Sequence, residues 1–466
     1  MRDVIWIQLD SIRYDHTSVP SSSYKRSTTP KLKQLAAGDR AYDFSRCYFH
    51  GIWTPASTAS ILTGLPPSRH GVGMYQQSLP QEVDTYPELL SETGYTTTGI
   101  STNVQISDLT DMNRGFDNFH YLIKENLLNS STIRELLEFI CLAEEESAGY
   151  TWDTKKHNAS YFVNELAKRQ ISKASSSSSP LFLFVHHNVT HHAYYPPEYF
   201  QSSFGEPELG IDQALELVLD MSYNINKYIA NGCAFSDKEW SALKMMYDAT
   251  LRYADQKIAE LVDYSQNHLD DPLIVVTADH GEFFGEDGLL DHKISTNTAV
   301  SHVPLIVQGV NLDRDIEDQI VQHSDIMQTV LQQAGTEINV PIGYDLNQQV
   351  RSYAVTQRGS ERCDNQISDI NRHNAKFDSD SFPDADVHSV QTEDYRYAYS
   401  EDFSRLFEIG GEDRIVDSVK GEIVDELEQF ISEWLNKWGQ PILSDGEKEI
   451  DEKTQKRLRD LGYMTE

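Results

Sequence analysis

Two apolar runs, one near the N-terminus and one past the middle of the chain, each end in a carboxylate. Asp10 follows the run Val4–Leu9, and Asp279 and His280 follow the run Leu273–Ala278. Nearly uninterrupted apolar runs of this length predict strands that are buried on both faces, as in a parallel sheet. Since ligands collect beyond the carboxyl ends of such strands, the pattern predicts that the three polar side chains meet at one edge.

Oxygen and nitrogen donors that meet in this way suit a hard or borderline divalent ion. Taken alone, Asp279-His280-Gly281 is better explained as a polar turn after a strand. The second strand end, which delivers Asp10, favours a metal site over a plain turn.

A third segment, Thr54–Gly64, is made of small and hydroxyl residues and a short apolar stretch, and it ends in glycine. Thr54 followed by Pro55 predicts a helix start, because proline is tolerated in the first turn. The N-terminus of a helix offers unpaired N–H groups and a positive dipole end, which suit phosphate or sulfate. A hydroxyl placed there beside a metal can become a nucleophile, although the spacing alone favours a plain helix cap.

The rest of the chain alternates between strand and helix patterns. A strand is predicted around Tyr95–Ile100, and Tyr247–Tyr264 has apolar residues at helical spacing. Arg351–Arg414 is polar and strand-like, and helical spacing returns over Asp417–Trp438. These patterns predict an α/β protein whose last quarter differs in character from the rest.

The segment Thr54–Gly64 resembles the sulfatase signature, in which Cys or Ser is followed by x-Pro-Ser-Arg-Ala-Ser-x-x-Thr-Gly. Further likenesses follow in family order: Asp10–Asp15, Thr29–Ala36, Gly115–Phe119, Thr277–Glu282, Val303–Ile306, Asp325–Thr329, Tyr395–Tyr397 and Leu461–Tyr463. The chain is therefore identified as a member of the sulfatase branch of the alkaline-phosphatase-like superfamily. The resemblance implies a large, mostly parallel sheet flanked by helices over residues 1–350. It also implies a small subdomain over residues 351–466, with antiparallel strands, helices and a charged tail.

The chain departs from the family pattern at the nucleophile. Thr54 occupies the position of the Cys or Ser that becomes formylglycine, and oxidation of threonine would give a ketone instead of an aldehyde. The resemblance then implies a metal set of Asp10, Thr54, Asp279 and His280, similar to that of superfamily phosphodiesterases and phosphoglycerol transferases. Ser11 replaces a second family aspartate. With imidazole in place of carboxylate, one divalent ion is expected, with manganese or zinc favoured and calcium possible.

The histidine-rich segment after Leu181–Val185 resembles a family segment that begins at His186 and places an anion-binding residue and general acid at His191. A second zinc site built from these histidines is the alternative. The two-metal enzymes of the superfamily carry an aspartate in this loop, where this chain has Asn188 and Thr190, so one metal is favoured.

Two neighbouring residues, His292 and Lys293, fall where family members carry a substrate-binding His or Lys. Either can hold a substrate oxygen, so both are expected to act in catalysis. Asn103 is a weaker pocket candidate, because asparagine after a strand is more often a turn residue.

The implied activity is metal-dependent hydrolysis of sulfate or phosphate esters with Thr54 as the nucleophile. Phosphoesters are slightly favoured, because a threonine sulfate lacks the hemiacetal route of release that formylglycine provides. Three alternatives stay open: a phosphoglycerol-transferase-like phosphotransferase, a sulfatase that uses unmodified Thr54, and a non-catalytic member that binds anionic glycans or lipids. The expected partner is a small-molecule, glycan or lipid ester, whose alcohol part the sequence leaves open, as it does the oligomeric state.

The composition argues against nucleic acid as a partner and suggests that the protein works in concentrated salt. The formal net charge of -34, from 73 acidic and 39 basic residues, argues against non-specific nucleic-acid binding. Such acidity suits concentrated salt, where self-repulsion is screened, so a halophilic source is hypothesised. The four cysteines are far apart and predict no disulfide framework. The chain has no apolar run of 18 residues, so no transmembrane segment is expected. Its start does not resemble a signal peptide, so a cytoplasmic location is expected.

Overall fold

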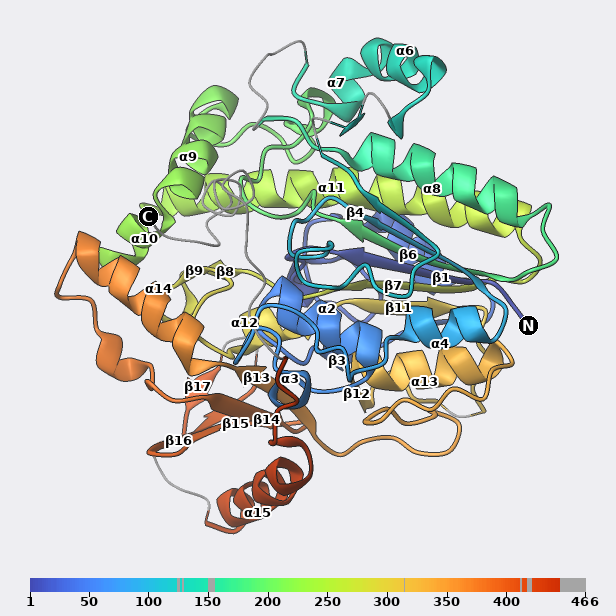
Figure 1. The fold of residues 1–466 in the computed structure, drawn as a ribbon. Coiled ribbons are helices and arrows are strands. Elements are labelled where there is room, and N and C mark those ends of the chain that lie inside the picture. The colour runs from blue at the N-terminus through green and yellow to red at the C-terminus, as the bar shows by residue number, and fades with distance from the viewer. Residues whose placement is uncertain are drawn as a thin grey trace.

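The computed structural model describes residues 1–123, 126–127, 130–149, 156–313, 315–410, 413–416 and 421–444. At its centre is a seven-stranded sheet in the order β2-β11-β7-β1-β6-β4-β5 (Figure 1). The strands are β1 (Val4–Leu9), β2 (Ala41–Asp43), β4 (Thr96–Ser101), β5 (Asn118–Tyr121), β6 (Leu181–His187), β7 (Leu273–Ala278) and β11 (Leu305–Gln308). Neighbouring strands are parallel except at β11, which runs antiparallel to β7 and β2. The prediction of a large, mostly parallel sheet is confirmed.

The carboxyl ends of the central strands are level with one another. Leu9 of β1 pairs with Ala278 of β7 on one side and with His187 of β6 on the other. All residues of these three strands are buried, which explains their apolar sequences. The residues that follow them, including Asp10 and Asp279, therefore emerge at one edge of the sheet.

Helices cover both faces of the sheet (Figure 1). α8 and α11 lie together on one face, and α2, α4 and α13 lie on the other. Their bounds are α2 (Thr54–Thr63), α4 (Tyr86–Glu92), α8 (Ser160–Ala174), α11 (Asp237–His268) and α13 (His323–Gln333). Further helices surround this core: α1 (Pro30–Ala36), α3 (Pro67–His70), α6 (Ile133–Cys141), α7 (Ala143–Glu146), α9 (Ile211–Tyr223), α10 (Ile225–Ala230) and α12 (Thr298–Ser301). Among the described residues, no helix is both long enough and apolar enough to cross a membrane.

A second sheet of five antiparallel strands follows in the chain, as expected (Figure 1). Its strands are β13 (Ala354–Arg358), β14 (Val387–Gln391), β15 (Tyr395–Ser400), β16 (Phe403–Glu408) and β17 (Arg414–Ile415). Helix α15 (Gly421–Trp438) packs on it through the buried Leu427 and Ile431. Residues 417–420 of the predicted last helix, Leu461–Tyr463 and the charged tail lie outside the described residues.

One helix interrupts the segment that the sequence pattern predicts to be strand-like. α14 (Ser360–His373) buries Cys363, Ile367 and Ile370, which recur at helical spacing in an otherwise polar stretch. Two smaller sheets complete the fold: β3 (Arg46–Tyr48) with β10 (His302–Val303) and β12 (Ile320–Val321), and a hairpin of β8 (Phe283–Phe284) and β9 (Leu290–Asp291). The hairpin follows β7 and leads back to the edge where Asp10 and Asp279 emerge.

Three buried histidines of this scaffold predict how stability depends on pH. Burial lowers the pKa of His70 to about 3 and that of His323 and His388 to about 4, from an ordinary value of 6.5. Because the unfolded chain then binds more protons than the native one, burial of these neutral rings lowers the free energy of unfolding as the pH drops from 6.5 toward 4. Above pH 6.5 the free energy of unfolding does not suffer this loss. For the metal-free protein we expect a loss of roughly 1 kcal/mol per histidine between pH 7.5 and 5.5, measured by urea unfolding.

A single substitution checks the origin of this pH dependence. Gln357 donates a hydrogen bond from Nε2 to His388 Nδ1 over 2.7 Å, and an asparagine at position 388 has no ring to protonate. His388→Asn should remove about a third of the pH dependence of the three histidines. A free energy of unfolding that is equal at both pH values would contradict the prediction.

Candidate active site

Thr54 is the first residue of helix α2, and its hydroxyl does not cap the helix. Trp53 occupies the N-cap position in an extended conformation, and Thr54 is the first helical residue. The helix ends at Gly64, whose φ of 66° lies in the left-handed region that favours glycine. All ten residues of α2 are buried. The interpretation of Thr54 as a plain N-cap is therefore wrong, and its Oγ1 is available for other contacts.

The structure brings the four predicted metal ligands together. His280 Nε2 lies 3.1 Å from Thr54 Oγ1, 3.5 Å from Asp10 Oδ1 and 3.7 Å from Asp279 Oδ2. One ligand atom from each of Asp10, Asp279 and His280 can be chosen so that all lie within 4.8 Å of one another. None of the four side chains is exposed to solvent. Two strand ends and one helix N-terminus thus converge on a single buried point.

The ring of His280 is oriented by its own backbone. His280 Nδ1 lies 2.9 Å from the Gly281 carbonyl oxygen, which can only accept, so Nδ1 donates and Nε2 of the neutral ring keeps its lone pair. Gly281 has no room for a side chain, because a Cβ there would lie 2.2 Å from the Ala299 carbonyl oxygen. This close packing fixes the loop that carries His280 and points a nitrogen lone pair at Thr54.

Ser11, Asn103 and His186 complete the wall around the carboxylates. Ser11 donates from Oγ to Asp10 Oδ1 over 2.9 Å and from its backbone N–H to Asp279 Oδ1 over 3.2 Å. Asn103 Nδ2 donates to Asp10 Oδ2 over 3.2 Å, so this residue does more than form a turn. His186 Nε2 lies 3.5 Å from Asp279 Oδ2, which its place at the start of a family segment did not indicate.

The donor set fits a divalent cation. Asp279 Oδ2 is buried and accepts no hydrogen bond of normal geometry, and neither ring nitrogen of His186 makes one. Burial by itself would raise the pKa of Asp279, but that pKa is lowered overall, because His280 and His186 beside it favour the charged carboxylate whenever their rings are protonated. A carboxylate kept ionised in a closed site needs positive charge beside it. Oxygen and imidazole donors around such a point suit a borderline dication.

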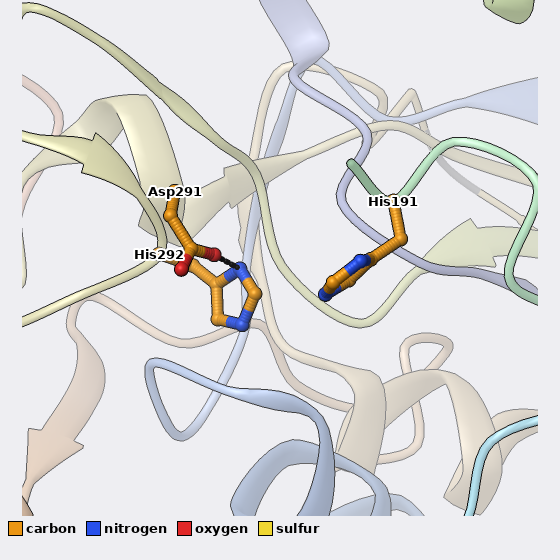
Figure 2. Close-up of side chains that lie close together, drawn as sticks. All are labelled: His191, Asp291 and His292. Carbon is orange, nitrogen blue, oxygen red and sulfur yellow. Dashed lines mark ion pairs between the residues drawn. The ribbon is translucent and has the colours of Figure 1, made fainter. Parts of the chain in front are cut away.

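A second group of side chains lies next to the first, and Figure 2 shows three of them, His191, Asp291 and His292. His292 stacks near His280, with ring centroids 4.0 Å apart, and His191 approaches His292 with ring centroids 5.4 Å apart. Burial lowers the pKa of His292 to about 4. Lys293 Nζ lies 3.3 Å from Asp291 Oδ2 and 3.2 Å from Asn226 Oδ1 of α10. The predicted catalytic residues His191 and His292 therefore border the metal-ligand cluster, whereas Lys293 is paired with a carboxylate.

Sequence reasoning missed two carboxylates of this region. Asp291 lies at the end of β9, and Glu282 follows Gly281 at the start of the hairpin; Glu282 has no solvent exposure. Burial raises the pKa of Glu282 far above its ordinary value, and the charges of Asp291 and Asp10 raise it further. The signal that could have found them is position, because each stands within two residues of a predicted histidine.

Closed clusters of this kind, at the carboxyl edge of an α/β sheet, are typical of hydrolytic enzymes that use a divalent cation. Residues 2–336 match the family model described as sulfatase, which is well over half of the chain. The protein therefore belongs to the sulfatase family. This confirms the resemblance seen in the sequence.

Individual relatives are distant. Arylsulfatase K of Bos taurus is 24% identical over 215 residues, which are 43% of this chain and 38% of that protein. The chain spans well under half of the length of the curated relatives that it matches. A phosphonate monoester hydrolase from Silicibacter pomeroyi superposes with a TM-score of 0.66 at 16% identity, covering 94% of this chain and 96% of the other. A 2-O GAG sulfatase gives 0.65 at 14% identity, with 94% and 92% coverage. These structures support the fold.

Proposed function

We propose that the protein is a metal-dependent hydrolase of phosphate and sulfate esters that uses Thr54 as its nucleophile and prefers phosphoesters. The observation that carries the proposal is the 3.1 Å contact between Thr54 Oγ1 and His280 Nε2 inside a closed cluster with Asp10 and Asp279. A hydroxyl packed against a set of metal ligands is the arrangement of a nucleophile that a bound cation activates.

Asp10, Thr54, Asp279 and His280 would hold the cation, which supplies Lewis-acid polarisation and a lower pKa for a coordinated hydroxyl. Thr54 Oγ1, having lost its proton, would attack phosphorus or sulfur and displace the alcohol, and water would then hydrolyse the Thr54 ester in a second step. The first N–H groups of α2 have no intrahelical partner and face developing charge on the equatorial oxygens. Imidazole among the ligands favours manganese or zinc over calcium.

The departing alcohol needs a proton or an equivalent positive charge, and His191 is the expected donor. His191 Nδ1 contacts the His192 carbonyl oxygen over 2.9 Å, which orients the ring, so Nε2 of the protonated ring would be the donating atom. His292, and Lys293 beside Asp291, are expected to hold substrate oxygens. Lys293 can do so only by sharing its charge with Asp291.

The chemistry of threonine supports phosphoester preference. A phosphothreonine is an ordinary covalent intermediate, whereas a threonine sulfate has no hemiacetal through which to release sulfate. Both substrate classes occur among the structural neighbours, one of which is a phosphonate monoester hydrolase and another a 2-O GAG sulfatase. The fold is therefore compatible with both substrate classes, and the threonine nucleophile is the reason to favour phosphoesters.

Steady-state hydrolysis of matched aryl substrates tests the proposal: a sulfate, a phosphate monoester, a phosphodiester and a phosphonate monoester with one leaving group. The assay is run in concentrated salt, because of the net charge of -34, after chelation and reloading with manganese, zinc or calcium. We expect metal-dependent turnover of at least one phosphorus substrate to exceed sulfate turnover by about tenfold or more. Preferential sulfate turnover would overturn the phosphoester preference, and no turnover of any substrate would favour a binding protein.

A further inference from the structure

A cavity between residues 341–353 and helix α15, here named the aromatic cavity, is lined by five side chains with rings: Tyr344, Tyr353, Phe430, Trp434 and Trp438. Its volume is about 260 Å³, and it opens to solvent. Ligand sites in proteins typically have roughly 300–1,000 Å³, so this cavity suits one ring-sized unit of a ligand that continues into solvent. No residue placed in the candidate active site lines it.

The aromatic cavity lies at the other end of α2 from the proposed nucleophile. Ile342, which lines the cavity, donates its backbone N–H to the Gly64 carbonyl oxygen over 3.3 Å. Gly64 is the C-cap of α2, whereas Thr54 is its first residue. A helix of ten residues is about 15 Å long. A unit bound in the cavity is therefore held apart from the ester that Thr54 is proposed to attack.

Helix α15 forms one wall of the cavity. Phe430, Trp434 and Trp438 recur every four residues, so they lie along one face of the helix. The Phe430 ring packs on Tyr353, with ring centroids 4.4 Å apart. Trp434 and Trp438 are only half-buried, so part of each indole stays open to a ligand. This wall offers flat apolar surface that the protein core does not cover.

The opposite wall is fixed by Arg351. Its Nε donates to Asp325 Oδ2 over 2.6 Å, and its guanidinium lies 5.1 Å from the centroid of the Tyr344 ring. Arg351 also donates to the Ile342 carbonyl oxygen over 3.0 Å. A buried ion pair thus holds the loop that carries Tyr344. A wall that is already in place costs little ordering when a ligand binds.

Polar groups are available at the edge of the cavity. The side chains of Gln349 and Ser352 are exposed and form no hydrogen bond with any residue that the structure describes. Lys437 is exposed, with its ammonium 4.7 Å from the centroid of the Trp438 ring, and pairs with no carboxylate among the described residues. In a chain with 73 acidic and 39 basic residues, both charged side chains among those that line the cavity, Arg351 and Lys437, are basic.

We propose that the aromatic cavity binds one unit of an acidic saccharide, a sugar chain that carries sulfate, phosphate or carboxylate groups. A sugar ring has a face of C–H groups that can pack on the Trp434 and Trp438 rings. The hydroxyls at its edge can bond to the amide of Gln349 and the hydroxyl of Ser352. An anionic substituent matches the Lys437 ammonium. The inference goes beyond the proposed function, because binding in this cavity needs neither Thr54 nor a cation.

Titration of tryptophan fluorescence tests the site on the full chain. The probes are a sulfated dextran oligosaccharide and an unsulfated one of the same length, at the lowest salt concentration that keeps the protein folded. A net charge of -34 repels a polyanion in general, so tight binding of the sulfated probe reports a local site. We expect its dissociation constant to be at least about tenfold lower than that of the unsulfated probe.

Two variants locate the binding. Trp434→Ala should weaken binding of the sulfated probe by about tenfold or more, because it removes a stacking surface. Lys437→Glu should weaken it by a similar factor and leave the affinity for the unsulfated probe within about twofold. Trp434 also packs against the small C-terminal core, so the exposed Lys437 keeps the test valid if Trp434→Ala does not fold.

Lys244→Glu is the matched control. Lys244 also lies over a tryptophan ring, 5.9 Å from the centroid of Trp240, but on α11 and outside the cavity. It changes the net charge equally and should bind the sulfated probe like the unmodified protein. Equal affinity for the two probes, no binding of either, or an effect of Lys437→Glu no larger than that of Lys244→Glu would overturn the site. Turnover of small aryl esters is measured separately, so either proposal can fail without the other.

Discussion

Thr54→Ala is expected to lower kcat/KM for the best ester substrate by at least about 10³-fold while the fold and substrate binding persist. The substitution removes Oγ1, the atom that lies 3.1 Å from His280 Nε2 and that would form the covalent ester. It keeps Asp10, Asp279 and His280, so a cation can still bind. The measurement is steady-state turnover of the metal-loaded variant, together with direct binding of the unhydrolysed substrate.

Two further variants show whether the hydroxyl itself is responsible. Thr54→Ser restores an oxygen at the same place and should keep turnover within about tenfold of the unmodified protein. Thr58→Ala is the matched control on the same buried helix, because its hydroxyl accepts a 2.8 Å hydrogen bond from Gln8 and does not contact the cluster. Thr54→Ala with turnover close to that of the unmodified protein would show that another nucleophile, such as a bound water, attacks the ester.

The parts of the site that follow central strands were predictable from the sequence. Asp10 and Asp279 come directly after fully buried strands, and parallel pairing of β1 with β7 levels their ends. Hydrophobic pattern and one topological rule were therefore enough to place two carboxylates together. Thr54 needed the added resemblance to a signature, since spacing alone also allowed a cap.

The remaining residues depend on contacts that a sequence does not reveal. His186 lies beside Asp279 only because β6 and β7 flank β1, with His186 opposite Gln8 in the register. Asp291 reaches the cluster at the end of a hairpin whose two strands have two residues each, too short to give a hydrophobic pattern. In a chain with 73 acidic residues, Glu282 and Asp291 carry no compositional signal. The burial that sets them apart is a property of the folded state.

Asp279→Asn is expected to abolish metal-dependent stabilisation and to reduce turnover by about 10³-fold or more. Asp279 Oδ1 accepts backbone hydrogen bonds from Ser11 over 3.2 Å and from His280 over 2.9 Å, and an asparagine oxygen can accept both. The other oxygen, Oδ2, faces His186 and His280, and the amide nitrogen that replaces it can neither bind a cation nor carry charge. The substitution therefore removes one ligand and preserves the strand end.

Thermal unfolding with and without manganese or zinc separates a lost ligand from a damaged fold. A cation held only by the native state stabilises it by about 2.7 kcal/mol at a hundred times its dissociation constant. The unmodified protein should show a gain of this order, and Asp279→Asn should lose most of it while unfolding normally in chelator. Asp255→Asn is the control, because Asp255 is also buried and accepts two backbone hydrogen bonds, from Lys31 and Leu32, outside the cluster. Equal metal stabilisation of Asp279→Asn and the unmodified protein would remove Asp279 from the ligand set, and with it the reason for placing the nucleophile beside a cation.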